Sequence, residues 1–187
     1  FERFAYIQTD DGYFDMQDRR ELSRNTFNAL FRHIDCKSVH NVKRRVEAAT
    51  SFDELRQAKG AKALVGVTYA AGESVLVARD GMVYGNRWRD ARPKAAPGDI
   101  SQWLAHVERM VPERFEREHL PNALAHKVQF PTHKINHAIL MGGNHGSGKD
   151  TLFAPFFWAI GGDAKANCSL VKNEDLSSQW GYALECE

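Results

Sequence analysis

A glycine-rich loop between two apolar segments is the feature that most constrains the fold of this chain. The loop reads Gly142-Gly-Asn-His-Gly-Ser-Gly-Lys-Asp-Thr151. The apolar run His137–Met141 in front of it predicts a short strand, and the apolar residues behind it, through about Ile160, predict a helix. A strand, a glycine loop and a helix in this order are the setting of a phosphate-binding loop. We therefore expect a fold of the α/β class.

The residue types of the loop suit the binding of phosphates. The spacing Gly143-x4-Gly148-Lys149 matches the phosphate-binding loop except at its last position. Glycines let the backbone turn its amides inward, and Lys149, the candidate catalytic residue, brings a positive charge to the β and γ phosphates. His145 is expected to be a spacer that faces solvent. The candidate nucleotide-binding residues are Gly143, Asn144, His145, Gly146, Ser147, Gly148, Lys149, Asp150 and Thr151.

The last position of the motif is the one whose hydroxyl group contacts Mg²⁺. Asp150 stands where the motif has Ser or Thr, and Thr151 follows one residue later. One residue along a helix is a rotation of about 100°, which turns the Thr151 hydroxyl away from the expected place. A carboxylate binds Mg²⁺ directly or through water, although its charge opposes the triphosphate. Asp150 and Thr151 are therefore the candidate Mg²⁺ residues.

The first part of the chain carries strand and helix signals of its own. The runs Phe4–Ile7 and Tyr13–Met16, joined by Asp10-Asp11-Gly12, predict a hairpin. A helix is expected to start at Asp18 or Ser23 and to bury one face made of Leu22, Phe27, Leu30, Phe31 and Ile34. The sequence Ser51-Phe-Asp-Glu54 is typical of a capping box at a helix start, and Gly60 would end that helix.

The middle of the chain predicts a small antiparallel sheet and then two helices. Residues 64–88 form short apolar runs separated by Ala71-Gly72 and Asp80-Gly81. After a connector at residues 92–98, Asp99 is expected to cap a helix through Met110, and a second helix, kinked or divided by Pro121, would follow. We expect an α+β connecting domain at 1–98, a helical linker region at 99–130, and the start of a P-loop ATPase domain with αβα layers at 131–187.

The charge and composition of the chain say less about its binding partners than the glycine loop does. The formal net charge is +1, which splits into +4 for residues 1–98 and −3 for residues 99–187. No apolar run is long enough to cross a membrane, and three cysteines without CxxC spacing favour a reducing cytosol. The stretch Arg79–Lys94 is basic, and Arg87, Arg89 and Arg92 are the candidate DNA contacts. Its tryptophan, Trp88, is expected to be buried rather than stacked on a base.

The residues around the loop resemble a known family. The string from Lys134 to Pro155, with its Lys149-Asp-Thr151 ending, is similar to the Walker A region of phage and plasmid primase-helicase proteins. These proteins carry a superfamily 3 helicase module of the AAA+ class. Four upstream segments resemble the region that precedes that module: residues 66–73, 86–89, 98–99 and 104–112.

The resemblance implies an ATP-hydrolysing replicative DNA helicase in the cytoplasm of a bacterial host. Its cofactors would be ATP and Mg²⁺, its substrate single-stranded or forked DNA, and its active form a ring-shaped homo-oligomer, expected as a hexamer. In the family a Walker B carboxylate pair completes the site. The apolar run before Glu185 and Glu187 is too short for the buried strand that carries it. We expect that strand beyond Glu187, and therefore a fragment that binds nucleotide but hydrolyses little of it.

Two other functions fit parts of the sequence. Small nucleotide kinases also carry Gly-Ser-Gly-Lys-Asp-Thr, but they need a long stretch after the loop, and only 38 residues follow Lys149. Alternatively, residues 1–130 form a non-catalytic connector that binds DNA or a protein partner, with the P-loop serving assembly alone. A steep salt dependence of DNA binding would distinguish this connector.

Overall fold

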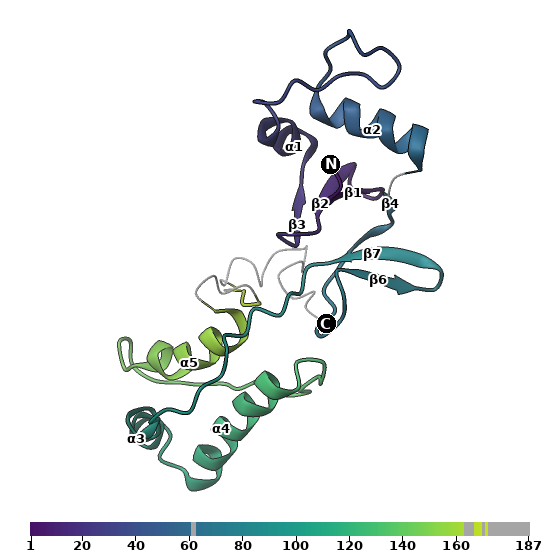
Figure 1. The fold of residues 1–187 in the computed structure, drawn as a ribbon. Coiled ribbons are helices and arrows are strands. Elements are labelled where there is room, and N and C mark those ends of the chain that lie inside the picture. Colours follow the sequence, from purple (N-terminus) through teal and green to yellow (C-terminus); the bar gives the residue numbers. More distant parts are fainter. Residues whose placement is uncertain (61–62, 163–166, 170, 172–187) are drawn as a thin grey trace. The chain divides into compact units, whose positions relative to one another are not determined.

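The computed structural model has mixed helices and small sheets, as the α/β class requires (Figure 1). It describes residues 1–60, 63–162, 167–169 and 171. The chain divides into two compact units, Phe1–Trp88 (unit 1) and Arg89–Glu187 (unit 2). The division precedes the connector at residues 92–98, which contains neither helix nor strand.

Unit 1 begins with the predicted hairpin, which is confirmed. Strands β1 (Phe4–Ile7) and β2 (Gly12–Asp15) pair in antiparallel fashion. Strand β3 (Arg20–Leu22) extends the sheet beside β2, and the short β4 (Ala63–Leu64) joins β1 in parallel. The sheet order is therefore β3-β2-β1-β4.

Two helices accompany this sheet. Helix α1 (Arg24–Leu30) starts at Ser23, one of the two predicted caps, whose hydroxyl oxygen accepts from the Thr26 N–H. The predicted buried face is correct for Phe27 but wrong for two residues, since Leu30 is 38% exposed and Ile34, which lies beyond the helix, is 48% exposed. The helix is too short to bury the whole predicted stripe.

Helix α2 (Ala48–Lys59) ends as predicted at Gly60, which has a left-handed φ of 65°. Its predicted capping box is wrong, because the helix begins before Ser51. The amide oxygen of Asn28, on α1, accepts from the Ala49 N–H at 2.8 Å and caps the new start. Ser51 instead donates to the Lys37 carbonyl. A contact between helices has replaced the local cap.

The second sheet of unit 1 differs from its prediction. Strands β5 (Gly66–Thr68), β6 (Leu76–Arg79) and β7 (Met82–Asn86) lie in the order β5-β7-β6. The β6–β7 pair is antiparallel, but β5 and β7 are parallel, so the sheet is mixed. The buried Asn86 side chain explains the crossover, because it bonds to Ala70 N–H and to the carbonyls of Ala70 and Ser74. It holds the connection between β5 and β6 in place, where an antiparallel pair of strands was expected.

The core of unit 1 lies on both sides of the first sheet. An aromatic cluster occupies one part, where the Tyr13 and Phe27 rings stack with centroids 4.1 Å apart. A smaller aliphatic cluster contains Ile7, Phe14 and Leu64. Both clusters are made by residues of unit 1, so this unit has a core of its own.

The described part of unit 2 contains three helices and the segments that join them (Figure 1). They are α3 (Ser101–Met110), α4 (Arg114–Gln129) and α5 (Lys149–Gly161). Pro121 does not divide α4, which runs through it as one helix. The shared core is made of Val107, Val111, Leu120, Leu124 and Leu152. Among the residues that the structure describes, no helix is long and apolar enough to cross a membrane.

The strand predicted at His137–Met141 is not formed. A strand of this kind needs neighbours that bond to both of its edges, and every strand in the described part of the chain belongs to unit 1. The apolar run instead forms an irregular segment, in which Leu140 is 98% exposed while Met141 packs on the helical core. The glycine loop therefore follows an irregular segment and opens a helix.

Candidate nucleotide-binding loop

Three glycines of the loop have positive φ angles. Gly143, Gly146 and Gly148 have φ angles of 152°, 75° and 97°, a region that other residues rarely enter. Gly148 is the last residue before α5. The chain therefore turns at residues 145–148, directly before it enters the helix.

Lys149 places its ammonium group at the centre of the loop. It is the first residue of α5 and is half-buried. Its Nζ atom donates to the carbonyls of Gly143 at 3.1 Å and Asn144 at 2.9 Å, and to Ser147 Oγ at 3.2 Å. All three hydrogens of the ammonium are thus used by the loop that would receive a phosphate. An entering phosphate oxygen would take over some of these hydrogen bonds.

The start of α5 adds further donors. Helix α5 has 13 residues and no side-chain cap. The first amides of a helix lack acceptors within it, and the helix dipole places partial positive charge at this end. Lys149 and these amides therefore point their positive charge toward the same region of the loop. This combination favours an anion such as a phosphate.

The candidate metal residues lie on the first turn of the same helix. Asp150 and Thr151 are both exposed. No group of three or more His, Cys, Asp or Glu side chains suited to a metal ion occurs among the described residues. A Mg²⁺ ion at this site would therefore depend on phosphate oxygens and water for most of its ligands. His145 is exposed, as predicted for a spacer.

The sequence did not reveal a contact from α3 that holds the end of the glycine loop in place. His106, on α3, lies with Nε2 3.0 Å from the Gly148 carbonyl oxygen. Its other ring nitrogen, Nδ1, lies 2.6 Å from the Arg109 guanidinium, which can only donate. Nδ1 is therefore the acceptor, and Nε2 carries the hydrogen that is donated to Gly148. This chain of two hydrogen bonds anchors the residue that opens α5.

A second contact from α3 supports the same helix. The Trp103 indole N–H donates to the Leu152 carbonyl at 3.0 Å. Trp103, His106, Val107 and Met110 follow one another at helical spacing on α3. That spacing is the signal by which the inward-facing histidine could have been found.

The candidate DNA contacts are divided between the two units. Arg87 belongs to unit 1, where it lies 3.6 Å from Glu21, whereas Arg89 and Arg92 belong to unit 2. The Arg92 guanidinium bonds to both carboxylate oxygens of Asp90, and these bonds lower the pKa of Asp90. Arg87 and Arg92 thus already have carboxylate partners. Trp88 is buried, as expected, with 9% of its surface exposed.

Glu185 and Glu187, the carboxylates near the end of the sequence, lie outside the described residues. Comparisons with protein-family models, curated proteins and solved structures found no match. The resemblance to primase-helicases therefore rests on the sequence alone, on the loop with its flanking residues and on the four upstream segments.

Proposed function

We propose that the chain binds ATP with Mg²⁺ at residues 143–151 and serves in an ATP-dependent replicative DNA helicase of a phage or mobile element. The helicase would act on single-stranded or forked DNA as a ring-shaped homo-oligomer, expected as a hexamer, in the cytoplasm of a bacterial host. The observation that carries the proposal is the Lys149 ammonium group inside a loop of positive-φ glycines that opens a helix. The helicase part rests on the sequence resemblance.

The residues of the loop support binding more directly than hydrolysis. Lys149 and the amides can hold and orient the triphosphate, but cleavage also needs a group that positions water and an arginine finger that stabilises the transferred charge. The loop contains neither. We therefore expect the chain to bind ATP and to hydrolyse it slowly or not at all.

Replacing the loop lysine tests the nucleotide site. We expect Lys149→Ala to weaken the binding of ATP·Mg²⁺ by at least about tenfold, because the variant loses a charge-assisted bond to phosphate. Titration calorimetry measures this directly, and AMP should bind the unchanged chain much more weakly than ATP. Lys134→Ala is the matched control, since it removes an exposed lysine outside the loop. Unchanged ATP affinity in Lys149→Ala would contradict the proposed site.

A further inference from the structure

A second basic segment, in unit 1, has no role in the nucleotide site. We call residues 37–45, which join α1 to α2, the basic finger. Its sequence, Lys-Ser-Val-His-Asn-Val-Lys-Arg-Arg, has four cations and no carboxylate. The stretch Arg79–Lys94, by contrast, includes Asp80 and Asp90. Counting acids together with bases would have singled out the finger from the sequence.

Hydrogen bonds close the finger into a narrow, hairpin-like loop. Lys37 and Arg45 form an antiparallel bridge, and the Ser38 N–H donates to the Arg44 carbonyl at 3.0 Å. At the tip, the Arg44 N–H donates to the Asn41 carbonyl, and the Lys43 N–H donates to Asn41 Oδ1. The cations therefore lie on both sides of a defined turn, at Lys37 and at Arg44 and Arg45, and within it, at Lys43.

The base of the finger is held by a carboxylate of α2. Glu54 accepts from the Val39 N–H at 2.7 Å. Hydrogen bonds from Ser38 and Val39 keep the pKa of Glu54 below its ordinary value, so it stays charged at neutral pH. The finger is thus fixed to α2, which limits the entropy that it would lose on binding a partner.

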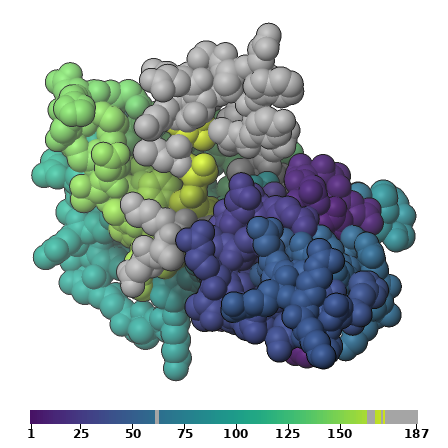
Figure 2. Space-filling view, turned by 90° about the horizontal axis from the view of Figure 1, so that it is seen from above, coloured from purple at the N-terminus to yellow at the C-terminus, as the bar shows by residue number. Residues whose placement is uncertain are grey.

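Most cations of the finger are free to meet a partner. Arg45 pairs with Asp35, whereas Lys37, Lys43 and Arg44 are exposed and have no ion pair in the part of the chain that the structure describes. Val42 lies in the turn between Asn41 and Lys43, and its side chain is 69% exposed. In Figure 2 the blue surface of this part of unit 1 faces the viewer. The finger therefore presents an apolar tip flanked by charge.

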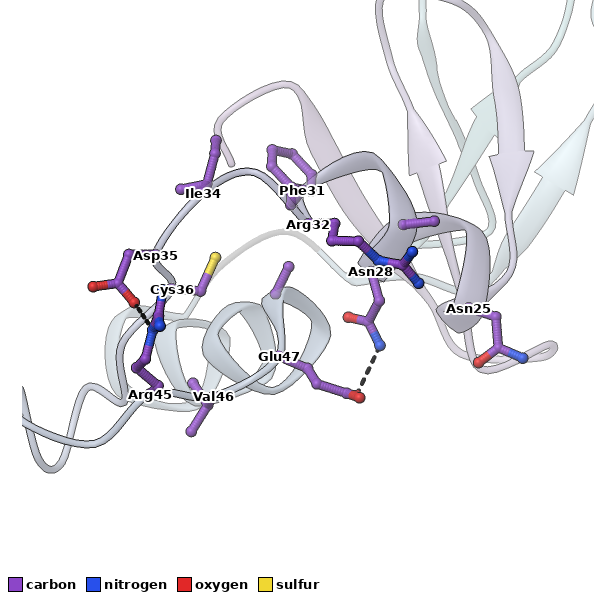
Figure 3. A pocket seen from close by; sticks show the side chains of 12 residues that line it. Asn25, Asn28, Phe31, Arg32, Ile34, Asp35, Cys36, Arg45, Val46 and Glu47 are labelled. Atoms are coloured by element: carbon purple, nitrogen blue, oxygen red, sulfur yellow. Dashed lines mark hydrogen bonds and ion pairs between the residues drawn. The ribbon is translucent and has the colours of Figure 1, made fainter.

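A hollow of about 560 Å³ lies beside the base of the finger (Figure 3). Its carboxylates are both engaged, Asp35 with Arg45 and Glu47 with the Asn28 amide. Arg32, on the wall of the same hollow, is exposed. The charge of Asp35 is thus paired, whereas Glu47 keeps its negative charge at the side of the hollow next to α2.

We propose that the basic finger binds duplex DNA by entering a groove. The major groove admits a two-stranded ribbon, and the finger, a hairpin-like loop closed by one antiparallel bridge, is narrower than that. In every groove two rows of phosphates flank the base edges. Lys37 and Arg44, on opposite sides of the loop, would meet phosphates, and Val42 and Lys43, in the turn between them, would enter the groove. An acidic protein surface would satisfy the charges but would leave the exposed valine without a counterpart. This site is separate from the nucleotide loop.

Removing two cations of the finger tests the proposal. Three cations that neutralise phosphates of the groove predict that the affinity for a duplex oligonucleotide falls on the order of 40-fold between 50 and 200 mM salt. In Lys43→Ala with Arg44→Ala, the slope of log affinity against log salt should fall by about two units. Fluorescence anisotropy of the full chain measures both. Lys43→Arg with Arg44→Lys should keep the slope, and Lys149→Ala should leave duplex binding unchanged.

The rival basic residues supply the matched comparison. Arg87→Ala with Arg89→Ala removes the same number of charges and is expected to leave most duplex binding intact. Loss of binding in this variant, with full binding in the finger variant, would overturn the proposal. Equal affinity for single-stranded and duplex oligonucleotides would also overturn it, because a single strand has no groove.

Discussion

Gly148 is the residue at which the loop and the helices of unit 2 constrain each other. Its φ of 97° favours glycine on conformational grounds alone. A Cβ atom here would also lie 2.9 Å from Cε1 of His106, closer than non-bonded carbons approach. The motif predicts a glycine here because the backbone amides must turn toward a phosphate. The structure shows a second reason, which is that α3 packs too closely for a side chain. The contact with His106 joins positions 42 residues apart, so no local pattern reveals it.

Substitutions at Gly148 can separate conformational strain from crowding. Gly148→Ala should lower the free energy of unfolding by about 1–3 kcal/mol more than Gly146→Ala, which has a similar positive φ but open space around it. Adding His106→Ala should return part of that loss, which gives a favourable coupling between the two sites. Urea unfolding of the two glycine variants, of His106→Ala alone and of the double variant Gly148→Ala with His106→Ala measures these terms. Equal costs for the two glycine substitutions would show that His106 does not crowd Gly148.

The elements that were predicted correctly are determined by residues that lie close together in the sequence. The hairpin of β1 and β2, the Ser23 cap and the Gly60 terminus depend on neighbours in the chain. The wrong predictions depend on distant partners. The Asn28 amide moved the start of α2, and the Asn86 side chain holds the crossover between β5 and β6. Residues 137–141 have strand composition, but the described part of unit 2 offers no strand to pair with.

The second sheet depends on Asn86, which has no exposed surface. Its side chain bonds to backbone groups of Ala70, Glu73, Ser74 and Trp88. Asn86→Ala would leave several buried polar groups without partners, so we expect unit 1 to lose at least about 3 kcal/mol of stability. Circular dichroism during urea unfolding measures this loss. Asn41→Ala, at the exposed tip of the basic finger, is the control and should cost less than about 1 kcal/mol. A similar cost for both would mean that Asn86 does not hold the crossover.

At the scale of the whole molecule, each unit has its own core. The aromatic and aliphatic clusters lie in residues of unit 1, and the helical core lies in unit 2 together with the glycine loop. Sequence composition placed a connector at residues 92–98, but it could not show that the expected linker helices α3 and α4 pack with α5 in one core. That packing links the stability of unit 2 to any ligand of the loop.

Ligand binding should therefore stabilise one unit and not the other. ATP·Mg²⁺ at 100 times its dissociation constant adds about 2.7 kcal/mol to the unit that binds it. Two unfolding transitions are expected in calorimetry, and ATP should raise the midpoint of one only. Asn86→Ala should lower the transition of unit 1, and Val107→Ala, in the core of unit 2, should lower the other. ATP should raise the transition that Val107→Ala lowers, and Lys149→Ala should abolish that rise. If ATP instead raised the transition assigned to unit 1, the nucleotide would bind outside the glycine loop.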